Sequence, residues 1–298
     1  MFTSFSNFAN YPVFSGAKAR NTMLDWFFYD VGGLTAEERS ELVRERDIEG
    51  SILVVWPKGE RGDVSVRKFD DYEALRAASG DLVTRFTIAG VGSSDVGAAA
   101  FARTVANHFG CPVGAIVAGY GVADLLSEAM GGWFVLGGAN RVLQMYQDAM
   151  DHQTADQAVE PQATLTERRK DAETAETGDD SIALVSLLTD KDRQIELICG
   201  HSKGCLSIAS ALDSLAQSGK TDAIERQKDM QIITAGAVVA LPQVFRNVTQ
   251  NLGELDWFGG MNSRLSLDYT TVPGAWHHLN TTLPGHLDFD EVLESAAL

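Results

Sequence analysis

Short apolar runs alternate with helical patterns over two parts of the chain, residues 82–118 and 181–272. Apolar runs that are bounded by glycine or polar residues predict buried strands, and helices between such strands predict parallel winding. The strands expected on this basis are 82–89, 112–118, 195–199, 231–241 and 265–272. The helices expected are 96–109, 181–188, 206–212 and 242–252. We therefore predict an α/β fold, a three-layer α/β/α sandwich around a mostly parallel sheet.

The N-terminal residues do not follow this alternation, and we treat residues 1–47 as a helical extension. Residues 21–29 and 35–46 are helical in pattern, and Thr35 and Glu38 have the spacing of a capping box. Residues 51–56 and 63–69 read as two strands joined by a turn that contains proline and glycine. This pattern predicts a hairpin at the edge of the sheet.

An insertion, residues 120–185, separates two of the expected strands. Its first part is apolar and helical in pattern and includes Trp133 and Phe134. Residues 151–180 are acidic and poor in aromatic side chains, a composition typical of a mobile segment. The apolar part is interpreted either as a cap or lid above a binding site or as an ordinary core helix. Because no linker or repeat divides the chain, we expect one domain over residues 1–298.

The composition narrows the classes of partner that the protein is expected to bind. The chain carries 41 acidic and 24 basic residues, a formal net charge of -17, which argues against nucleic acid because phosphate binding needs basic surface. No run approaches the roughly 18 apolar residues that a membrane span requires. Residues 1–16 lack the features of a signal peptide, so we expect a cytoplasmic protein. The sequence does not indicate an oligomeric state.

Cysteine and histidine spacing gives no sign of a metal site. The three cysteines, Cys111, Cys199 and Cys205, are an odd number placed in predicted core, and we expect them to be reduced and buried. Neither a CxxC pair nor a histidine-rich segment is present. We therefore expect no metal.

One pentapeptide, Gly200-His201-Ser202-Lys203-Gly204, joins the expected strand at 195–199 to the expected helix at 206–212. A glycine two positions either side of Ser202 avoids collisions in a very tight turn and exposes the hydroxyl at the carboxyl edge of the sheet. The simpler interpretation is a serine in a closely packed connection. His201 is expected to point back toward the strand and to supply packing or a supporting hydrogen bond.

In this strand–turn–helix context the GxSxG pentapeptide resembles the nucleophile elbow of the α/β-hydrolase superfamily, over residues 82–286. The lipase- and esterase-like members are the most similar. The resemblance implies a Ser-Asp-His triad that hydrolyses carboxylic esters with a hydrophobic acyl group through an acyl-serine intermediate, without a cofactor. Polyester depolymerases, thioesterases and acyltransferases share this scaffold. A non-catalytic protein that keeps the fold is a further alternative.

The resemblance places the base after the acid, near the end of the chain. Residues 269–280 read YTTVPGAWHHLN, which is similar to the superfamily pattern of an apolar strand running into the catalytic histidine. This register selects His277, with Trp276 at the position often held by glycine. His278 and His286 are the alternatives.

Asp256, in the segment LGELDWFGG, is the leading candidate for the acid, and Glu254 is the runner-up. Asp256 is also a candidate N-cap for a helix that begins at Trp257.

Oxyanion donors in the superfamily are backbone amides. The resemblance implies the amide of Lys203 and amides of Val91 and Gly92 in the glycine-rich loop, with the Ser93 hydroxyl as an auxiliary donor near the substrate. The Lys203 side chain either steers a substrate carboxylate or is simply solvated.

Further substrate contacts are expected from Trp133, Phe134 and Trp276. The expected partner is a small-molecule or lipid-like ester.

Overall fold

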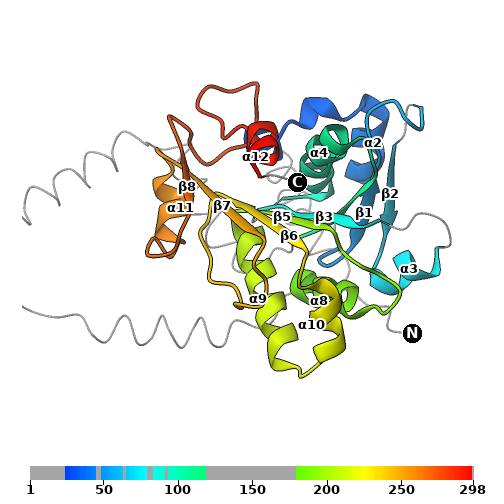
Figure 1. The fold of residues 1–298 in the computed structure, drawn as a ribbon. Coiled ribbons are helices and arrows are strands. Elements are labelled where there is room, and N and C mark those ends of the chain that lie inside the picture. The colour runs from blue at the N-terminus through cyan, green and yellow to red at the C-terminus, as the bar shows by residue number, and fades with distance from the viewer. Residues whose placement is uncertain are drawn as a thin grey trace, which may run out of the picture. The chain divides into compact units, whose positions relative to one another are not determined.

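The computed structural model describes residues 24–44, 48–62, 65–78, 83–90, 93–118 and 179–296. Within them lies one eight-stranded sheet with the strand order β2-β1-β4-β3-β5-β6-β7-β8 (Figure 1). The strands are β1 (Ile52–Val55), β2 (Val66–Phe69), β3 (Arg85–Ile88), β4 (Val113–Ile116), β5 (Leu197–His201), β6 (Gln231–Ala235), β7 (Val248–Gly253) and β8 (Thr270–Val272). β1 pairs antiparallel with β2 and β4, and all other pairs are parallel. The predicted α/β class with a mostly parallel sheet is confirmed.

Helices cover both faces of this sheet. They are η1 (Val31–Gly33, a 3-10 helix), α2 (Ala36–Arg44), α3 (Tyr72–Ala77), α4 (Asp95–Phe109), α8 (Asp179–Thr189), α9 (Lys203–Gln217), α10 (Thr221–Gln227), α11 (Trp257–Met261) and α12 (Phe289–Ser295). In Figure 1, α4 and α12 lie above the sheet and α8, α9 and α10 lie below it. Successive strand side chains point to opposite faces, and those of β1 accordingly enter two separate hydrophobic cores. The arrangement is compatible with a three-layer sandwich.

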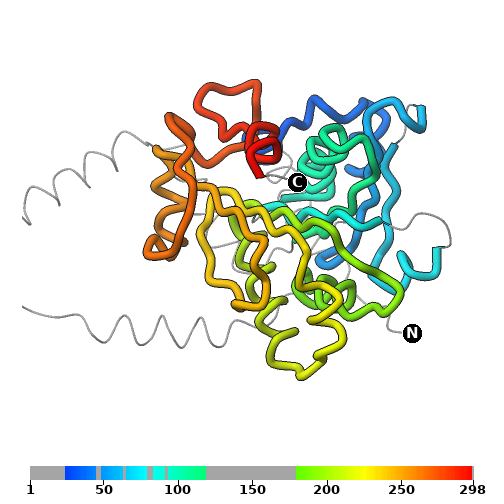
Figure 2. The backbone as a smooth tube through the Cα atoms, viewed as in Figure 1, coloured from blue at the N-terminus to red at the C-terminus, as the bar shows by residue number. Residues whose placement is uncertain are grey.

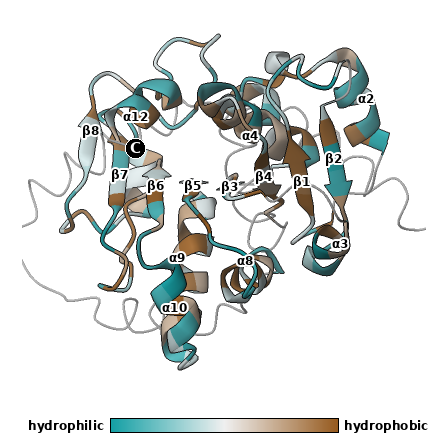
Figure 3. Cartoon of the chain, turned by 45° about the vertical axis from the view of Figure 1, so that its right-hand side comes forward, coloured by the Kyte–Doolittle hydropathy of each residue, from teal (hydrophilic) through white to brown (hydrophobic). Residues whose placement is uncertain are grey.

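The hairpin expected at the edge of the sheet is present. β1 is buried along its whole length, whereas β2 is largely half-buried or exposed. Figure 3 shows the same contrast, with β1 and β4 in brown and β2 mostly in teal. An interior strand that is covered by helices on both faces needs apolar side chains throughout, and an edge strand does not.

The predicted helix at 242–252 is wrong, because Val248–Gly253 forms strand β7 beside β6. β-Branched Val248 and Thr249 favour an extended chain, and Pro242 begins a turn that the Phe245 amide closes. The expected strands at 231–241 and 265–272 are also shorter than predicted, since they are limited to Gln231–Ala235 and Thr270–Val272.

The N-terminal extension is packed against the sheet domain. Figure 2 shows the blue segment that starts at residue 24 running close to α4 and the red helix α12, and all three contribute to one core. The capping box is confirmed, since the Glu38 amide donates to Thr35 Oγ1 at 3.1 Å and the Thr35 amide donates to Glu38 Oε2 at 2.8 Å. Buried Glu38 also pairs with Arg103 of α4 at 2.6 Å.

Residues 119–178, most of the expected insertion, lie outside the described residues, as do residues 1–23 of the extension. The end of the insertion, residues 179–185, belongs to α8, which contributes to the core below the sheet together with α9. In the described part of the chain, no helix is long and apolar enough to cross a membrane.

The three cysteines are free. Cys199 and Cys205 are buried, as expected, but Cys111 is only half-buried.

Candidate active site

Ser202 stands on a strained turn between β5 and α9. Its backbone angles are φ 54° and ψ -120°, and among the described residues it is the one non-glycine residue with a positive φ. Such a conformation costs on the order of 1–3 kcal/mol and is found mainly at functional sites. The Ser202 amide donates to the Ala235 carbonyl at 2.9 Å, which fixes the turn against β6.

The two flanking glycines are required by close packing. A Cβ atom on Gly204 would lie 2.1 Å from the carbonyl oxygen of Ile88 in β3. A Cβ atom on Gly200 would lie 2.7 Å from Ile208 Cδ1 and 3.0 Å from the Cys205 amide nitrogen. The steric reason for the glycine pair is therefore confirmed, and no larger residue fits without movement of the backbone.

Three loops at the carboxyl edge of the sheet bring Ser202, His277 and Asp256 together. His277 Nε2 lies 2.9 Å from Ser202 Oγ, and His277 Nδ1 lies 2.7 Å from Asp256 Oδ2. Because a carboxylate only accepts hydrogen bonds, Nδ1 of a neutral His277 carries the proton and Nε2 accepts from the serine hydroxyl. His277 and Asp256 are buried and Ser202 is half-buried.

Asp256 serves two partners at once. Its Oδ1 accepts a hydrogen bond of 2.6 Å from the Gly259 amide, so it caps α11 while Oδ2 faces His277. The two interpretations of Asp256 from the sequence, acid and N-cap, are therefore compatible. The cap fixes the carboxylate, because both of its oxygens are held in place.

Space for the His277 ring comes from the end of β6. Gly236 has φ +72°, and a Cβ atom there would lie 2.9 Å from His277 Cε1. This conformation ends the strand at Ala235 and makes room for the imidazole. The Phe258 ring meets His277 edge-on, with 4.8 Å between ring centroids.

His201 is in contact with His277 and supplies a supporting hydrogen bond, as the sequence predicted. Its Nε2 lies 2.8 Å from the carbonyl oxygen of His277, and its Nδ1 lies 2.8 Å from the Tyr29 hydroxyl. Burial is the main cause that lowers the pKa of His201 to about 3, with the neighbouring His277 adding to it. His201 is therefore neutral at physiological pH.

Sequence reasoning missed the contribution of an N-terminal segment, residues 25–30. Asp25 is buried and accepts hydrogen bonds from the Ser93 hydroxyl at 3.2 Å, the Ser94 amide at 3.3 Å and the Ser94 hydroxyl at 2.5 Å. Tyr29 Oη accepts from the Gly90 amide at 2.6 Å. The loop after β3 is thus held at both of its described ends. A run of four aromatic residues between two aspartates was the available signal, but it does not reveal what the run packs against.

The same segment also holds the loop that carries His277. The Leu279 amide donates to the Phe28 carbonyl at 2.8 Å, and the Asn280 side chain donates to the Trp26 carbonyl at 2.7 Å. Two chain segments about 250 residues apart in sequence therefore meet beside the site.

The residues expected to supply oxyanion donors are described only in part. Val91 and Gly92 lie outside the described residues. Gly90, which precedes them, is so close to the turn that a Cβ atom on it would lie 3.1 Å from Ser202 Cβ. The Ser93 hydroxyl directs its one proton toward Asp25, a geometry that does not suit an auxiliary donor to substrate.

The Lys203 side chain has acidic partners within the chain. Its Nζ lies 3.7 Å from the buried Asp180 and 4.0 Å from Glu49. It is therefore ion-paired within the chain and still partly exposed. A contact of this side chain with substrate stays a prediction.

The substrate contacts expected from Trp133 and Phe134 fall outside the described residues. Trp276 is half-buried and packs edge-on against Phe27, with 5.8 Å between ring centroids. Its contact with substrate remains a prediction.

The alternative base and acid candidates have other contacts. His278 is buried against the Phe27 ring, and burial lowers its pKa. His286 Nδ1 lies 3.0 Å from the Leu283 carbonyl oxygen. Exposed Glu254 accepts from the Gly274 amide at 2.8 Å. Of the candidates weighed from the sequence, His277 and Asp256 are the pair that the structure brings to Ser202.

No cluster of three or more metal-binding side chains occurs in the described ranges. In this arrangement a serine hydroxyl can pass its proton to a histidine, and a carboxylate orients that histidine. Nucleophilic attack on an acyl group requires such an arrangement. Comparisons of the chain with models of known protein families, with curated proteins and with solved structures gave no match.

Proposed function

We propose that the protein is a serine hydrolase of carboxylic esters, with Ser202 as nucleophile, His277 as general base and Asp256 as the orienting acid. The observation that carries this proposal is the pair of hydrogen bonds, 2.9 Å and 2.7 Å, that join the three side chains behind a strained serine. A merely structural serine needs neither the backbone strain nor the buried histidine and carboxylate.

The chemistry follows from the proton positions. Ser202 Oγ attacks the ester carbonyl carbon while its proton passes to His277 Nε2, and the imidazolium that forms is stabilised by Asp256. The tetrahedral intermediate collapses to an acyl-serine when the C–O bond to the alcohol breaks, and His277 returns the proton to the departing alkoxide oxygen. Water then attacks the acyl carbon while His277 takes its proton. The bond to Ser202 Oγ breaks, His277 returns the proton to this oxygen, and the carboxylic acid is released.

Oxyanion stabilisation is assigned to backbone amides. The Lys203 amide directly follows the nucleophile, and the loop after β3 begins at Gly90 against the Ser202 side chain. Donors that are held in place before the reaction cost little reorganisation, and losing one typically lowers kcat by about 10²–10³-fold.

A hydrophobic acyl group suits the apolar side chains that border the site. Phe258 contacts the His277 ring, and two other α11 side chains are exposed, Trp257 at 44% and Met261 at 65%. Each methylene that a substrate buries contributes about 0.8 kcal/mol, so activity should rise with acyl length by no more than about fourfold per carbon. The fold proposed is α/β-hydrolase-like, with a cap or lid formed by the insertion.

The test is the Ser202→Ala variant, assayed with p-nitrophenyl esters of graded acyl length and with a fluorophosphonate probe. We expect kcat to fall by on the order of 10⁴–10⁶-fold and labelling to disappear. Ser210→Ala is the matched control, because Ser210 is an exposed serine on the same helix α9. Ester hydrolysis that survives in Ser202→Ala would overturn the proposal. Labelling of Ser202 in a wild-type protein that turns over no ester would point to acyl transfer instead.

A further inference from the structure

The Tyr29 hydroxyl connects two loops of the site that are distant in sequence. Its oxygen accepts the Gly90 amide at 2.6 Å and lies 2.8 Å from His201 Nδ1. Tyr29 and His201 are both buried, with exposed fractions of 3% and 1%. The position is also sterically tight, since a Cβ atom on Gly90 would lie 3.2 Å from this hydroxyl.

One arrangement of protons satisfies these contacts. The carbonyl oxygen of His277 only accepts, so Nε2 of His201 must carry the proton that faces it. Nδ1 of the neutral ring is then an acceptor and receives the tyrosine proton. The tyrosine oxygen in turn receives the Gly90 amide. The hydrogen bonds therefore run in one direction, from Gly90 through Tyr29 and His201 to the backbone of His277.

We propose that Tyr29 and His201 are positioning residues that hold the loop after β3 in register with the backbone of the general base. This inference rests on the proposed function, since it concerns the same site. Neither residue touches a reacting atom. Their effect is on distance, because Gly90, which lies against the Ser202 side chain, and the imidazole of His277 must stand correctly about one acyl carbon.

The removal of the tyrosine hydroxyl tests this link. In Tyr29→Phe the Gly90 amide loses its acceptor, and Nδ1 of His201 loses its hydrogen-bond donor. We expect kcat and the rate of fluorophosphonate labelling to fall about 10–100-fold, because small misplacements of reacting groups have effects of this size. KM should stay within about twofold of the wild-type value, since the hydroxyl makes no contact with substrate.

Tyr72→Phe is the matched control. Tyr72 is a second buried tyrosine whose hydroxyl is also hydrogen-bonded, in its case to Asp190. A general effect of losing a buried hydroxyl would lower the unfolding temperature in both variants. A positioning effect would lower kcat and the labelling rate in Tyr29→Phe alone.

A second pair of variants covers the case in which Tyr29→Phe fails to fold. His201→Gln keeps an N–H group near the position of Nε2, whereas His201→Leu keeps none. We expect the glutamine variant to retain at least about tenfold more activity than the leucine variant at similar stability, because it can still donate to the His277 carbonyl.

The outcomes separate the two proposals. If the wild-type protein shows no Ser202-dependent labelling or hydrolysis, both fall. If Ser202→Ala is inactive while Tyr29→Phe matches the wild-type protein in kcat and labelling rate, the positioning role alone is overturned. Equal activity of His201→Gln and His201→Leu would overturn it as well.

Discussion

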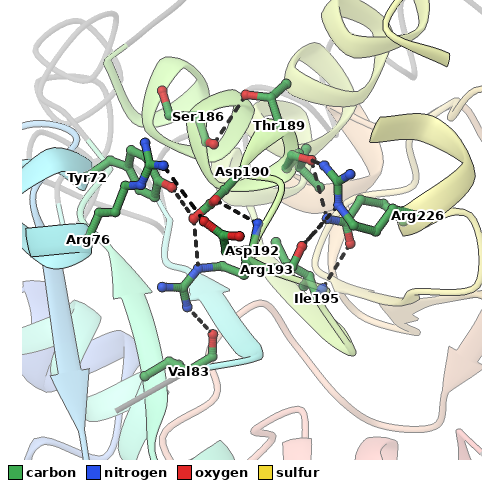
Figure 4. A network of polar contacts seen from close by, with 12 residues as sticks. Tyr72, Arg76, Val83, Ser186, Thr189, Asp190, Asp192, Arg193, Ile195 and Arg226 are labelled. Carbon is green, nitrogen blue, oxygen red and sulfur yellow. Dashed lines mark hydrogen bonds and ion pairs between the residues drawn. The ribbon is translucent and has the colours of Figure 1, made fainter. Parts of the chain in front are cut away.

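The parallel strands have a buried polar network at their amino ends, the amino edge of the sheet, and another at their carboxyl ends, the carboxyl edge. Of these two networks, the one at the carboxyl edge leads to a side chain that is only half-buried, Ser202. At the amino edge, the Tyr72 hydroxyl donates to Asp190, which also lies 3.9 Å from Arg193 Nε (Figure 4). Arg193 donates to the Val83 carbonyl. Gln227, which is fully buried, donates to the Arg193 carbonyl at 3.0 Å and accepts from the Ile195 amide at 2.9 Å. These contacts tie the segments that lead into β3, β5 and β6.

The carboxyl edge differs in what its network leads to. Its hydrogen bonds pass through neutral Tyr29 and His201 and through the His277–Asp256 pair, and they end at the half-buried hydroxyl of Ser202. The amino-edge network joins charged side chains to backbone groups. A buried tyrosine or carboxylate therefore does not by itself mark a functional site. What distinguishes the carboxyl edge is a serine that has a strained backbone and lies within hydrogen-bond reach of a base.

The largest difference between the edges is expected from Asp256→Asn against Asp190→Asn. Asparagine keeps an oxygen for the Gly259 amide, so the cap of α11 survives. Its NH₂ group, however, would donate to His277 Nδ1, which forces the proton onto Nε2, where it cannot accept from Ser202. We expect kcat to fall about 10³–10⁴-fold with little change in unfolding temperature.

Asp190→Asn should show the opposite pattern, a lower unfolding temperature with unchanged kcat. Glu254→Gln is a second control, because Glu254 was the other acid candidate and contacts the Gly274 amide. Full activity of Asp256→Asn, or an equal loss in Glu254→Gln, would contradict the assignment of the acid.

The next effect in size is the pH dependence of stability that His201 contributes. Its pKa falls from 6.5 to about 3 on folding, so between these values the unfolded chain binds more protons than the folded one. Stability from this group is complete above pH 6.5 and is lost as the pH decreases toward 3, by about 1.4 kcal/mol per pH unit.

Urea unfolding at pH 7 and pH 5 measures this effect. We expect His201 to account for a loss of about 2 kcal/mol in the free energy of unfolding of the wild-type protein over this interval. Between pH 7 and pH 5, the free energy of unfolding of His201→Gln should fall by about 2 kcal/mol less than that of the wild-type protein. The facing titratable groups, His277 and His278, are unchanged in the comparison. Equal pH slopes in the two proteins would contradict the prediction.

A third comparison concerns Asp25, which holds the loop after β3. Asp25→Asn weakens its acceptance from Ser93 and Ser94, and we expect a loss of about 1.5–3 kcal/mol in the free energy of unfolding and about tenfold in kcat. Asp30→Asn is the matched control. Asp30 lies in the same segment and accepts from the amide and hydroxyl of Thr281, at 2.9 Å and 2.8 Å. A similar loss of kcat in both variants would show that the segment acts only through stability.

Much of the sheet was predictable from the sequence because strands with helices on both faces must be apolar throughout. The chain between β6 and β7 was not, since a direct connection without a crossover helix leaves no periodic signal. β6 also ends early for a tertiary reason, the room that His277 needs beside Gly236. Local patterns carry no information about a side chain that arrives from another strand.

The candidate site likewise contains residues that the sequence predicted and residues that it did not. The turn at Ser202 and the positions of His277 and Asp256 follow from motif spacing and chain order. Tyr29 and Asp25 do not, because their roles depend on contacts with residues more than 60 positions away. Their segment lies before the first strand, where the hydrophobic pattern predicts only a short helix.

The hydrogen bonds between residues 25–30 and the loop after β8 have a consequence for folding. The Asn280–Trp26 bond spans 254 positions and the Thr281–Asp30 bonds span 251, nearly the whole chain of 298 residues. Contacts of such sequence separation are slow to form, because a long loop must be closed before they contribute. During synthesis residues 25–30 cannot make these hydrogen bonds until residues 279–281 have been added to the chain. An incomplete chain therefore cannot assemble the surroundings of Ser202. The proposed ester hydrolysis would then be among the last properties to return in refolding, later than the signal of the sheet.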